Sequence, residues 1–221
     1  MTKNENNCSV NAPFFSVIIT SYNRAGLLLR ALDSLISQTE KDWEAIVIDD
    51  GSTDDTGSRI SSYLQSAKKI SYVWQQSKGA TGAKNSGSLL AKGKYLTFLD
   101  SDDEYYPCHL QSRKEILEAN EEIEFLYGGI KIIGNQFVPN RFDYKQMIHL
   151  SDCSVGGTFF IKRTLFFSLG GFAEIPLGSD ADFFDRVNIS GIQKTKADHP
   201  TYIYHREHEN TITNNIAGCI L

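Results

Sequence analysis

The stretch Lys94-Tyr95-Leu96-Thr97-Phe98-Leu99-Asp100-Ser101-Asp102-Asp103 decides how this chain is organised. Its apolar and aromatic run, residues 95–99, is typical of a short strand buried on both faces of a parallel sheet. Three carboxylates follow this strand at once, and like charges held close together raise each other's energy. A cation is therefore expected there, either a side chain or a metal ion. A loop that is merely acidic is the alternative, and this motif alone does not decide between the two.

The sequence before this stretch alternates between strand and helix patterns. Apolar runs predict strands at residues 14–20, 44–48 and 70–74. After the first run, apolar residues recur at three- and four-residue spacing, which predicts a helix with one buried face: Leu28, Ala31, Leu32, Leu35 and Ile36. Thr53 or Asp54 is expected to cap a second helix, and Gly93 to end a third that opens at Gly79. This alternation predicts βαβ units and an α/β fold with a mostly parallel sheet.

The second half of the chain is less regular. Its patterns predict helices at residues 109–120, 163–169 and 180–189, and strands at 125–127, 130–133 and 156–161. Residues 135–152 are hard to assign. The polar, Asn-rich residues 1–12 predict a disordered tail. Residues 13–221 are predicted to form one domain, of which 13–103 are the nucleotide-binding half.

Composition restricts the class of protein. The 221 residues are 41% hydrophobic and carry a net charge of −5, which argues against a nucleic-acid partner. The four cysteines form no Cys-x-x-Cys pair, no apolar run approaches the roughly 18 residues of a membrane span, and the polar start lacks a signal peptide's apolar region. We therefore expect a cytoplasmic protein.

Three predicted strand ends carry polar groups to one edge of the sheet. They are residues 20–24, 49–50 and 100–103, and the glycine-rich segment 79–85 joins them. Mg²⁺ and Mn²⁺ prefer carboxylate oxygens, while Asp50 suits hydrogen bonds from a nucleobase N–H or a ribose hydroxyl. A plain turn would explain residues 49–52 equally well, and a helix start packed through small residues would explain 79–87.

Four segments in order, residues 17–24, 46–54, 82–87 and 95–103, together resemble the family 2 glycosyltransferases of GT-A fold. The resemblance covers nearly all of residues 14–213. It implies a single Rossmann-like domain for nucleotide-diphospho-sugars, in which residues 104–221 form the acceptor-binding half.

The resemblance also implies roles for individual residues on the donor side. The residues expected to bind the donor nucleotide are Thr20, Tyr22, Arg24, Asp50, Lys84, Asp100 and Ser101. Asp50 would hold the base, which is uracil in many members, and Asp100 would lie near the ribose. Asp102, the second acid of the Asp-x-Asp motif, would bind Mn²⁺ or Mg²⁺. Lys84 stands where the family often has arginine, and it keeps the charge without the planar fork.

On the acceptor side, the resemblance points to Gly156 and Gly157 and makes Asp180 the catalytic aspartate, with Ser179 in place of the usual glutamate. From the residues alone, Asp180 and Asp182 are equally well explained as acids favoured by a helix N-terminus. His205 and His208 fall where related enzymes place basic or metal-binding residues. Solvated side chains are the alternative for both histidines.

The function implied is a metal-dependent, inverting glycosyltransferase. It would move a sugar from a nucleotide diphosphate, a UDP-sugar being expected, to a hydroxyl of a saccharide or lipid-linked acceptor in surface polysaccharide synthesis, with Asp180 as general base. A lipid-linked acceptor would bring the protein into loose contact with the inner membrane face. Both tryptophans, Trp43 and Trp74, lie too early for the Gln-x-x-Arg-Trp motif of processive synthases, so a single transfer is expected.

Two alternatives remain at this point. A sugar-phosphate nucleotidyltransferase would carry a glycine-rich loop with Thr and Arg after the first strand, where this chain has residues 21–26. A non-catalytic nucleotide-sensing α/β module would use Asp49 and Asp50, but it would leave Asp180 and the acids of residues 100–103 without a role. The sequence leaves the oligomeric state open.

Overall fold

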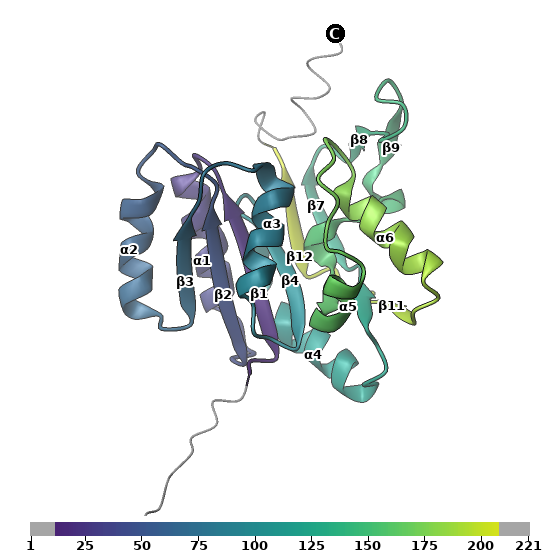
Figure 1. The fold of residues 1–221 in the computed structure, drawn as a ribbon, viewed down its shortest axis with the longest axis horizontal. Helices are drawn as coiled ribbons and strands as arrows, with labels where there is room; N and C mark the ends of the chain where they lie inside the picture. Colours follow the sequence, from purple (N-terminus) through teal and green to yellow (C-terminus); the bar gives the residue numbers. More distant parts are fainter. Residues whose placement is uncertain (1–11, 208–221) are drawn as a thin grey trace, which may run out of the picture.

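The computed structural model describes residues 12–207, so all but the last residue of the expected tail lies outside the described part. The main sheet has seven strands: β1 Phe15–Ser21, β2 Trp43–Asp49, β3 Ile70–Trp74, β4 Tyr95–Asp100, β6 Phe125–Tyr127, β10 Phe160–Lys162 and β11 Lys194–Lys196. Six helices accompany it: α1 Ala25–Ile36, α2 Thr56–Ser66, α3 Gly79–Leu90, α4 His109–Ala119, α5 Arg163–Ser168 and α6 Ser179–Ile189. Helices cover both faces of the sheet (Figure 1). Within residues 12–207, no helix is long and apolar enough to cross a membrane.

The strand order of the main sheet is β11-β6-β10-β4-β1-β2-β3. The four strands β4, β1, β2 and β3 are parallel, β10 runs antiparallel to β4 and β6, and β11 is parallel to β6. The register sets Thr20 opposite both Ile48 and Asp100. Because parallel strands in this register end side by side, the polar residues that follow them meet at one edge.

Two smaller sheets complete the fold. One contains β5 Glu104–Tyr105, β12 Tyr202–Arg206 and β7 Ile130–Gly134, and it lies where the acidic end of β4 continues. The other is a hairpin of β8 Phe137–Pro139 and β9 Met147–His149, within the segment that the sequence pattern left unassigned. Figure 1 shows this hairpin at the upper edge of the molecule, the edge toward which β1 and β4 point.

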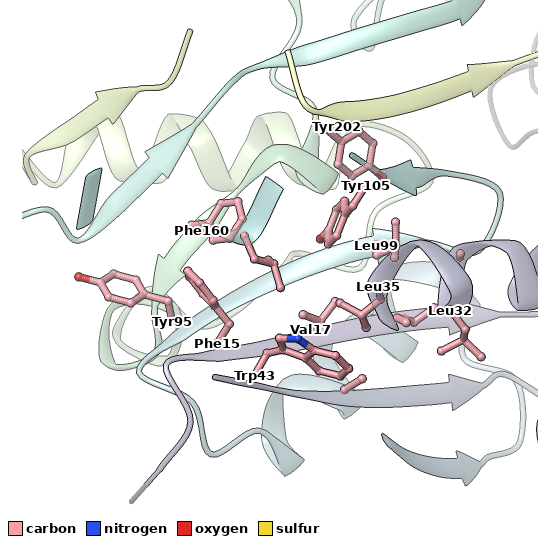
Figure 2. Close-up of a cluster of buried hydrophobic side chains, with 14 of the residues drawn as sticks. Phe15, Val17, Leu32, Leu35, Trp43, Tyr95, Leu99, Tyr105, Phe160 and Tyr202 are labelled. Carbon is pink, nitrogen blue, oxygen red and sulfur yellow. The ribbon is translucent and has the colours of Figure 1, made fainter. Parts of the chain in front are cut away.

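The core lies on both faces of the central strands, because successive side chains of a strand point to opposite faces. Phe15, Val17 and Ile19 pack with the apolar face of α1 in one cluster (Figure 2). Ile18 packs on the other face with side chains of α3, α5 and α6. Each such fully buried side chain stabilises the fold by about 1.5–3 kcal/mol, so the two clusters fix the strand ends that carry the polar groups.

Three predictions for the first half were wrong in detail. Ile36, expected on the buried face of α1, is 38% exposed because it ends the helix. The cap of α2 is Asp55, although the Asp54 carboxylate does accept a hydrogen bond from the Thr56 amide. Helix α3 ends at Leu90, and Gly93 has a different role: a Cβ there would lie 2.6 Å from the Ser16 amide nitrogen, so glycine permits the close approach of the chain to β1.

The predicted strand over residues 156–161 is also wrong in its first part. Gly156–Thr158 forms a 3₁₀ turn, and only Phe160–Lys162 pairs as β10. The turn is favoured because two glycines there bring the backbone close to other elements. A Cβ on Gly157 would lie 2.3 Å from the ring of Tyr202, and one on Gly156 would lie 3.1 Å from the Cβ of Asp180.

Candidate functional site

A cavity of about 1440 Å³ opens at the edge where β1, β2 and β4 end. Among its lining residues are most of those proposed from the sequence: Thr20, Tyr22, Arg24, Asp50, Lys84, Asp100, Ser101, Asp102, Gly156, Asp180 and His205. Gly157 is not among them, because it lies under the Tyr202 ring. His208 lies outside the described residues. The fold therefore gathers residues separated by up to 185 positions in sequence around one cavity.

Two cationic side chains lie against the negative charges of Asp100, at the end of β4, and Asp102, just after it. Arg24, just before α1, contacts Asp102 at 2.7 Å between Nη1 and Oδ2, and Lys84 of α3 contacts Asp100 at 2.7 Å between Nζ and Oδ1. The cation expected beside these acids is thus supplied at least in part by side chains, neither of which is adjacent to the acids in sequence. Burial lowers the pKa of Lys84, but the charge of Asp100 and its hydrogen bond outweigh this and raise the pKa overall, so Lys84 stays protonated.

The third acid, Asp103, has a different environment. It is fully buried and accepts hydrogen bonds from the Tyr202 hydroxyl at 2.6 Å and the His205 amide at 2.8 Å. Burial and the nearby acids Asp100 and Asp102 raise its pKa well above the ordinary value. Asp103 therefore joins β12 to the end of β4 and does not line the cavity.

Both oxygens of Asp50 accept hydrogen bonds from within the chain. The donors are the Gln75 side chain at 2.7 Å, the Ser77 hydroxyl at 2.9 Å, the Lys78 amide at 2.9 Å and the Gly79 amide at 2.8 Å. A carboxylate offers about four acceptor positions, so this set engages all of them. Asp50 thus fastens the segment before α3 to the end of β2 while lining the cavity. That Asp50 binds a nucleobase remains a prediction. A hydrogen bond from a nucleobase to Asp50 would require one of these four donors to move away.

Asn23 joins the loops after β1 and β2. Its backbone has a φ of 51°, a left-handed conformation that asparagine tolerates better than most residues. Its Oδ1 accepts a hydrogen bond from the Thr53 amide at 2.8 Å, and its own amide donates to the Ser52 hydroxyl at 2.8 Å. Tyr22 and Arg24 on either side of Asn23 are therefore held at the cavity wall.

Asp180 lies at the start of α6 and is held by two backbone amides. Its Oδ2 accepts from the Gly156 amide at 3.0 Å and its Oδ1 from the Ala181 amide at 2.9 Å. Burial raises its pKa above the ordinary aspartate value, and the Gly156 amide and the charge of Lys84 oppose this only in part. A fixed carboxylate in a cavity wall, with a raised pKa, has the properties of a general base.

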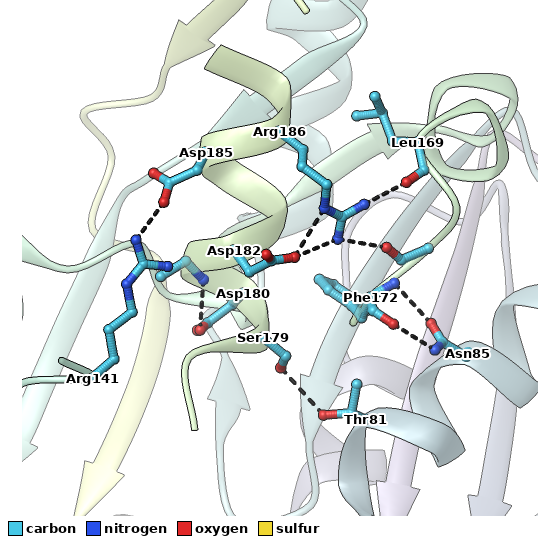
Figure 3. A network of polar contacts seen from close by, with 12 residues as sticks. Thr81, Asn85, Arg141, Leu169, Phe172, Ser179, Asp180, Asp182, Asp185 and Arg186 are labelled. Atoms are coloured by element: carbon cyan, nitrogen blue, oxygen red, sulfur yellow. Dashed lines mark hydrogen bonds and ion pairs between the residues drawn. The ribbon is translucent and has the colours of Figure 1, made fainter. Parts of the chain in front are cut away.

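Contacts from α3 and α6 hold the wall around Asp180 (Figure 3). Asn85 donates to the Phe172 carbonyl at 2.9 Å and accepts from the Phe172 amide at 3.0 Å, and Thr81 donates to the Ser179 hydroxyl at 3.2 Å. Asp182 instead pairs with Arg186 at 2.8 Å, which supports a structural role for this second acid. No sequence pattern indicated that Asn85 contacts Phe172.

His205 also lines the cavity. Its Nε2 lies 2.8 Å from Glu104 and its Nδ1 lies 3.6 Å from Glu207. Within the described residues, no group of three or more His, Cys, Asp or Glu side chains could hold a metal ion. Asp100 and Asp102 still fit Mg²⁺ or Mn²⁺, because one or two carboxylates are enough when substrate phosphates supply the other ligands. Binding at Asp102 would displace its contact with Arg24.

Comparison with solved structures supports the fold. The chain is similar to Staphylococcus aureus TarS (residues 1–349, in complex with UDP-GlcNAc), with a TM-score of 0.76, 20% identity and coverage of 90% of this chain and 60% of that one. It is also similar to the mannosyltransferase PcManGT of Pyrobaculum calidifontis, in complex with GDP-Man and Mn²⁺, with a TM-score of 0.70, 20% identity and coverage of 88% and 57%. The expected GT-A fold is thereby confirmed.

Comparison by sequence places the chain in a family. An Escherichia coli relative, the UDP-Glc:alpha-D-GlcNAc-diphosphoundecaprenol beta-1,3-glucosyltransferase WfgD, is 33% identical over 155 residues, which cover 68% of this chain and 60% of the relative's length. The family model described as glycosyl transferase family 2 matches residues 16–169, well over half of the chain. The four sequence segments that resemble this family, residues 17–24, 46–54, 82–87 and 95–103, all contribute residues to one cavity. This chain therefore belongs to the family 2 glycosyltransferases.

Proposed function

We propose that this protein transfers a sugar from a nucleotide diphosphate, a UDP-sugar, to a hydroxyl of a lipid-linked saccharide in surface polysaccharide synthesis, with inversion at the anomeric carbon. Family membership supports sugar transfer. The name of the relative WfgD includes UDP-Glc and diphosphoundecaprenol, which suggests the donor and the acceptor. The structural neighbour TarS was solved in complex with UDP-GlcNAc, which agrees with a UDP-sugar donor. The match to the glycosyl transferase family 2 model disfavours the two alternatives, a sugar-phosphate nucleotidyltransferase and a nucleotide-sensing module.

One observation carries the proposal: a single cavity holds Asp180 together with Lys84 and Asp100. Sugar transfer needs a base for the acceptor hydroxyl, charge compensation for the departing diphosphate, and alignment of the two substrates. Asp180 supplies a carboxylate with a raised pKa, fixed by the Gly156 amide. Lys84 is a protonated amine near both acids, because the charges of Asp100 and Asp180 each raise its pKa.

The remaining roles follow from position. The donor nucleotide would lie against Thr20, Tyr22 and Asp50 at the ends of β1 and β2, with its diphosphate toward Lys84 and Arg24. Asp102 would bind Mn²⁺ or Mg²⁺, which neutralises negative charge on a diphosphate leaving group. The acceptor would enter between Gly156 and residues 175–180, so that its hydroxyl reaches Asp180. Asp180 would take the hydroxyl proton as the acceptor oxygen bonds to the anomeric carbon and the bond from that carbon to the diphosphate breaks, releasing the nucleoside diphosphate.

The test is a screen of nucleotide sugars with Mn²⁺, first by thermal shift and then by release of nucleoside diphosphate in the presence of a diphospho-polyprenyl saccharide. A donor at 100 times its dissociation constant adds about 2.7 kcal/mol to the free energy of unfolding, which is easily seen as a rise in Tm. We expect one or two UDP-sugars to raise Tm and to yield UDP with acceptor. Failure of every nucleotide sugar to bind would refute the proposal.

A further inference from the structure

Residues 100–103 form a tight turn at the edge of the main sheet. The Asp103 amide donates a hydrogen bond to the Asp100 carbonyl at 2.9 Å, and this bond closes the turn. Asp102 lies inside the turn, so the backbone of the turn determines where its carboxylate stands. Side chains that hold this backbone from outside therefore set the position of the acid that is assigned to the metal.

Strand β12 holds one side of the turn. The Asp103 carboxylate accepts hydrogen bonds from the Tyr202 hydroxyl at 2.6 Å and from the His205 amide at 2.8 Å. Both contacts fix Asp103. The peptide of Asp102 has a different partner, on the other side of the turn.

That partner is Arg30 of α1, which does not line the cavity. Its Nη2 donates to the Asp102 carbonyl at 2.5 Å, and its Nε lies 3.3 Å from Oε1 of Glu104, the first residue of β5. The same Glu104 oxygen lies 2.8 Å from Nε2 of His205. One guanidinium thus contacts the residue before Asp103 and the residue after it, and so it spans the end of the turn.

Helix α1 is a firm support for Arg30. The apolar face of the helix is packed on the sheet, with Leu28 and Leu32 fully buried. Ser34, one turn after Arg30, accepts a hydrogen bond from the Tyr105 amide at 3.1 Å. Side chains four residues apart share one face of a helix. Arg30 and Ser34 therefore fasten the turn, and the strand that follows it, to the same face of α1.

We propose that Arg30 is a positioning residue for metal-dependent donor binding: it fixes the backbone of Asp102 so that this carboxylate meets Mn²⁺ or Mg²⁺ without rearrangement. The inference rests on the proposed function, because it takes Asp102 as the metal ligand. Groups that hydrogen-bond behind metal ligands orient them, and their loss typically lowers metal affinity by about 10–100-fold. Charge alone predicts the opposite result, since a nearby cation repels the metal and its removal would favour metal binding.

The test is calorimetry of UDP binding by the full chain at a series of Mn²⁺ concentrations. Arg30→Lys keeps the positive charge but loses the planar fork that reaches two partners. We expect the Mn²⁺ concentration for half-maximal UDP binding to rise about tenfold or more in this variant. At saturating Mn²⁺, its affinity for UDP should stay near wild type, because Arg30 does not line the cavity.

Arg163→Lys is the matched control. Arg163 is partly buried, as Arg30 is, and its guanidinium lies 5.2 Å from the Phe167 ring centroid. Its amide donates to the carbonyl of Lys94, just before β4, so it lies at the end of this strand opposite to Asp100. This control should keep the wild-type Mn²⁺ requirement. Arg30→Met removes the charge together with the fork, and a higher Mn²⁺ requirement in this variant as well would exclude a purely electrostatic role.

Three results would overturn the proposal: a wild-type Mn²⁺ requirement in Arg30→Lys, a lower requirement in Arg30→Met, or an equal rise in Arg163→Lys. A loss of UDP affinity in Arg30→Lys that is the same at every Mn²⁺ concentration would also overturn it, by giving Arg30 a role in general stability only. If UDP binding by the wild type does not depend on Mn²⁺, the proposed metal at Asp102 fails, and this inference fails with it. A wild type that requires Mn²⁺, beside an unaffected Arg30→Lys, refutes this inference alone.

Discussion

Replacing Asp180 by asparagine separates catalysis from binding and folding. Asparagine keeps the shape of the side chain but cannot take a proton at pH 7. We expect transfer to fall by ~10²–10⁴-fold, equivalent to about 2.7–5.4 kcal/mol on the activation barrier. Donor and metal affinity should stay near wild type, because both Asp180 oxygens accept hydrogen bonds from the chain's own amides.

The structure also bounds the effect of this substitution on stability. The carbonyl of asparagine can accept from only one of the two amides, Gly156 or Ala181, so about one charge-assisted hydrogen bond is lost, roughly 1.5–3 kcal/mol. Against this, the variant no longer buries a charge, and burial is the main cause of the raised pKa of Asp180. The net change should stay within about 2 kcal/mol, and at roughly 2–4 °C per kcal/mol the variant remains folded at 25 °C.

The assay is the rate of UDP release with acceptor as a function of pH, beside calorimetry of donor binding. In the wild type, transfer should decline as the pH falls through the raised pKa of Asp180, at a higher pH than an ordinary aspartate with a pKa of 3.8 would give. Asp182→Asn is the control and should lose little activity, since Asp182 pairs with Arg186. Undiminished transfer by Asp180→Asn would remove this residue from the mechanism, and loss of donor binding would move it to the donor site.

Three further predictions can be checked with the same preparations. Removing metal with EDTA and changing Asp102→Ala should each weaken nucleotide-diphosphate binding in calorimetry; unchanged affinity after both would contradict a metal at Asp102. Asp50→Asn should weaken UDP binding by about 1.5–3 kcal/mol, and retained affinity would leave Asp50 with only its structural contacts to residues 75–79. Gly157→Ala should lower stability by about 1–3 kcal/mol through overlap with the Tyr202 ring, whereas Gly26→Ala, with open space around it in α1, should be neutral or stabilising in thermal unfolding.

The sequence by itself determined the parallel half of the fold and its functional edge. Strand β3 and the start of α3 were predicted at the observed residues, and β1, β2 and β4 to within one residue. This succeeded because buried parallel strands are continuous apolar runs, and the helices between them carry a regular apolar face. Since parallel strands end at one edge, the meeting of Thr20, Asp50 and Asp100 at the cavity also followed from the sequence.

Only the tertiary structure decided which groups compensate these acids. Arg24, just before α1, contacts Asp102, Lys84 of α3 contacts Asp100, and Asp103 accepts a hydrogen bond from the Tyr202 hydroxyl of β12. No local pattern encodes such pairs, because they depend on how the helices pack on the sheet. The β8–β9 hairpin was likewise missed, since its strands are three residues long and its outward face is apolar instead of alternating. Short strands carry too little periodicity to be seen, and their partners are set by contacts with the rest of the fold.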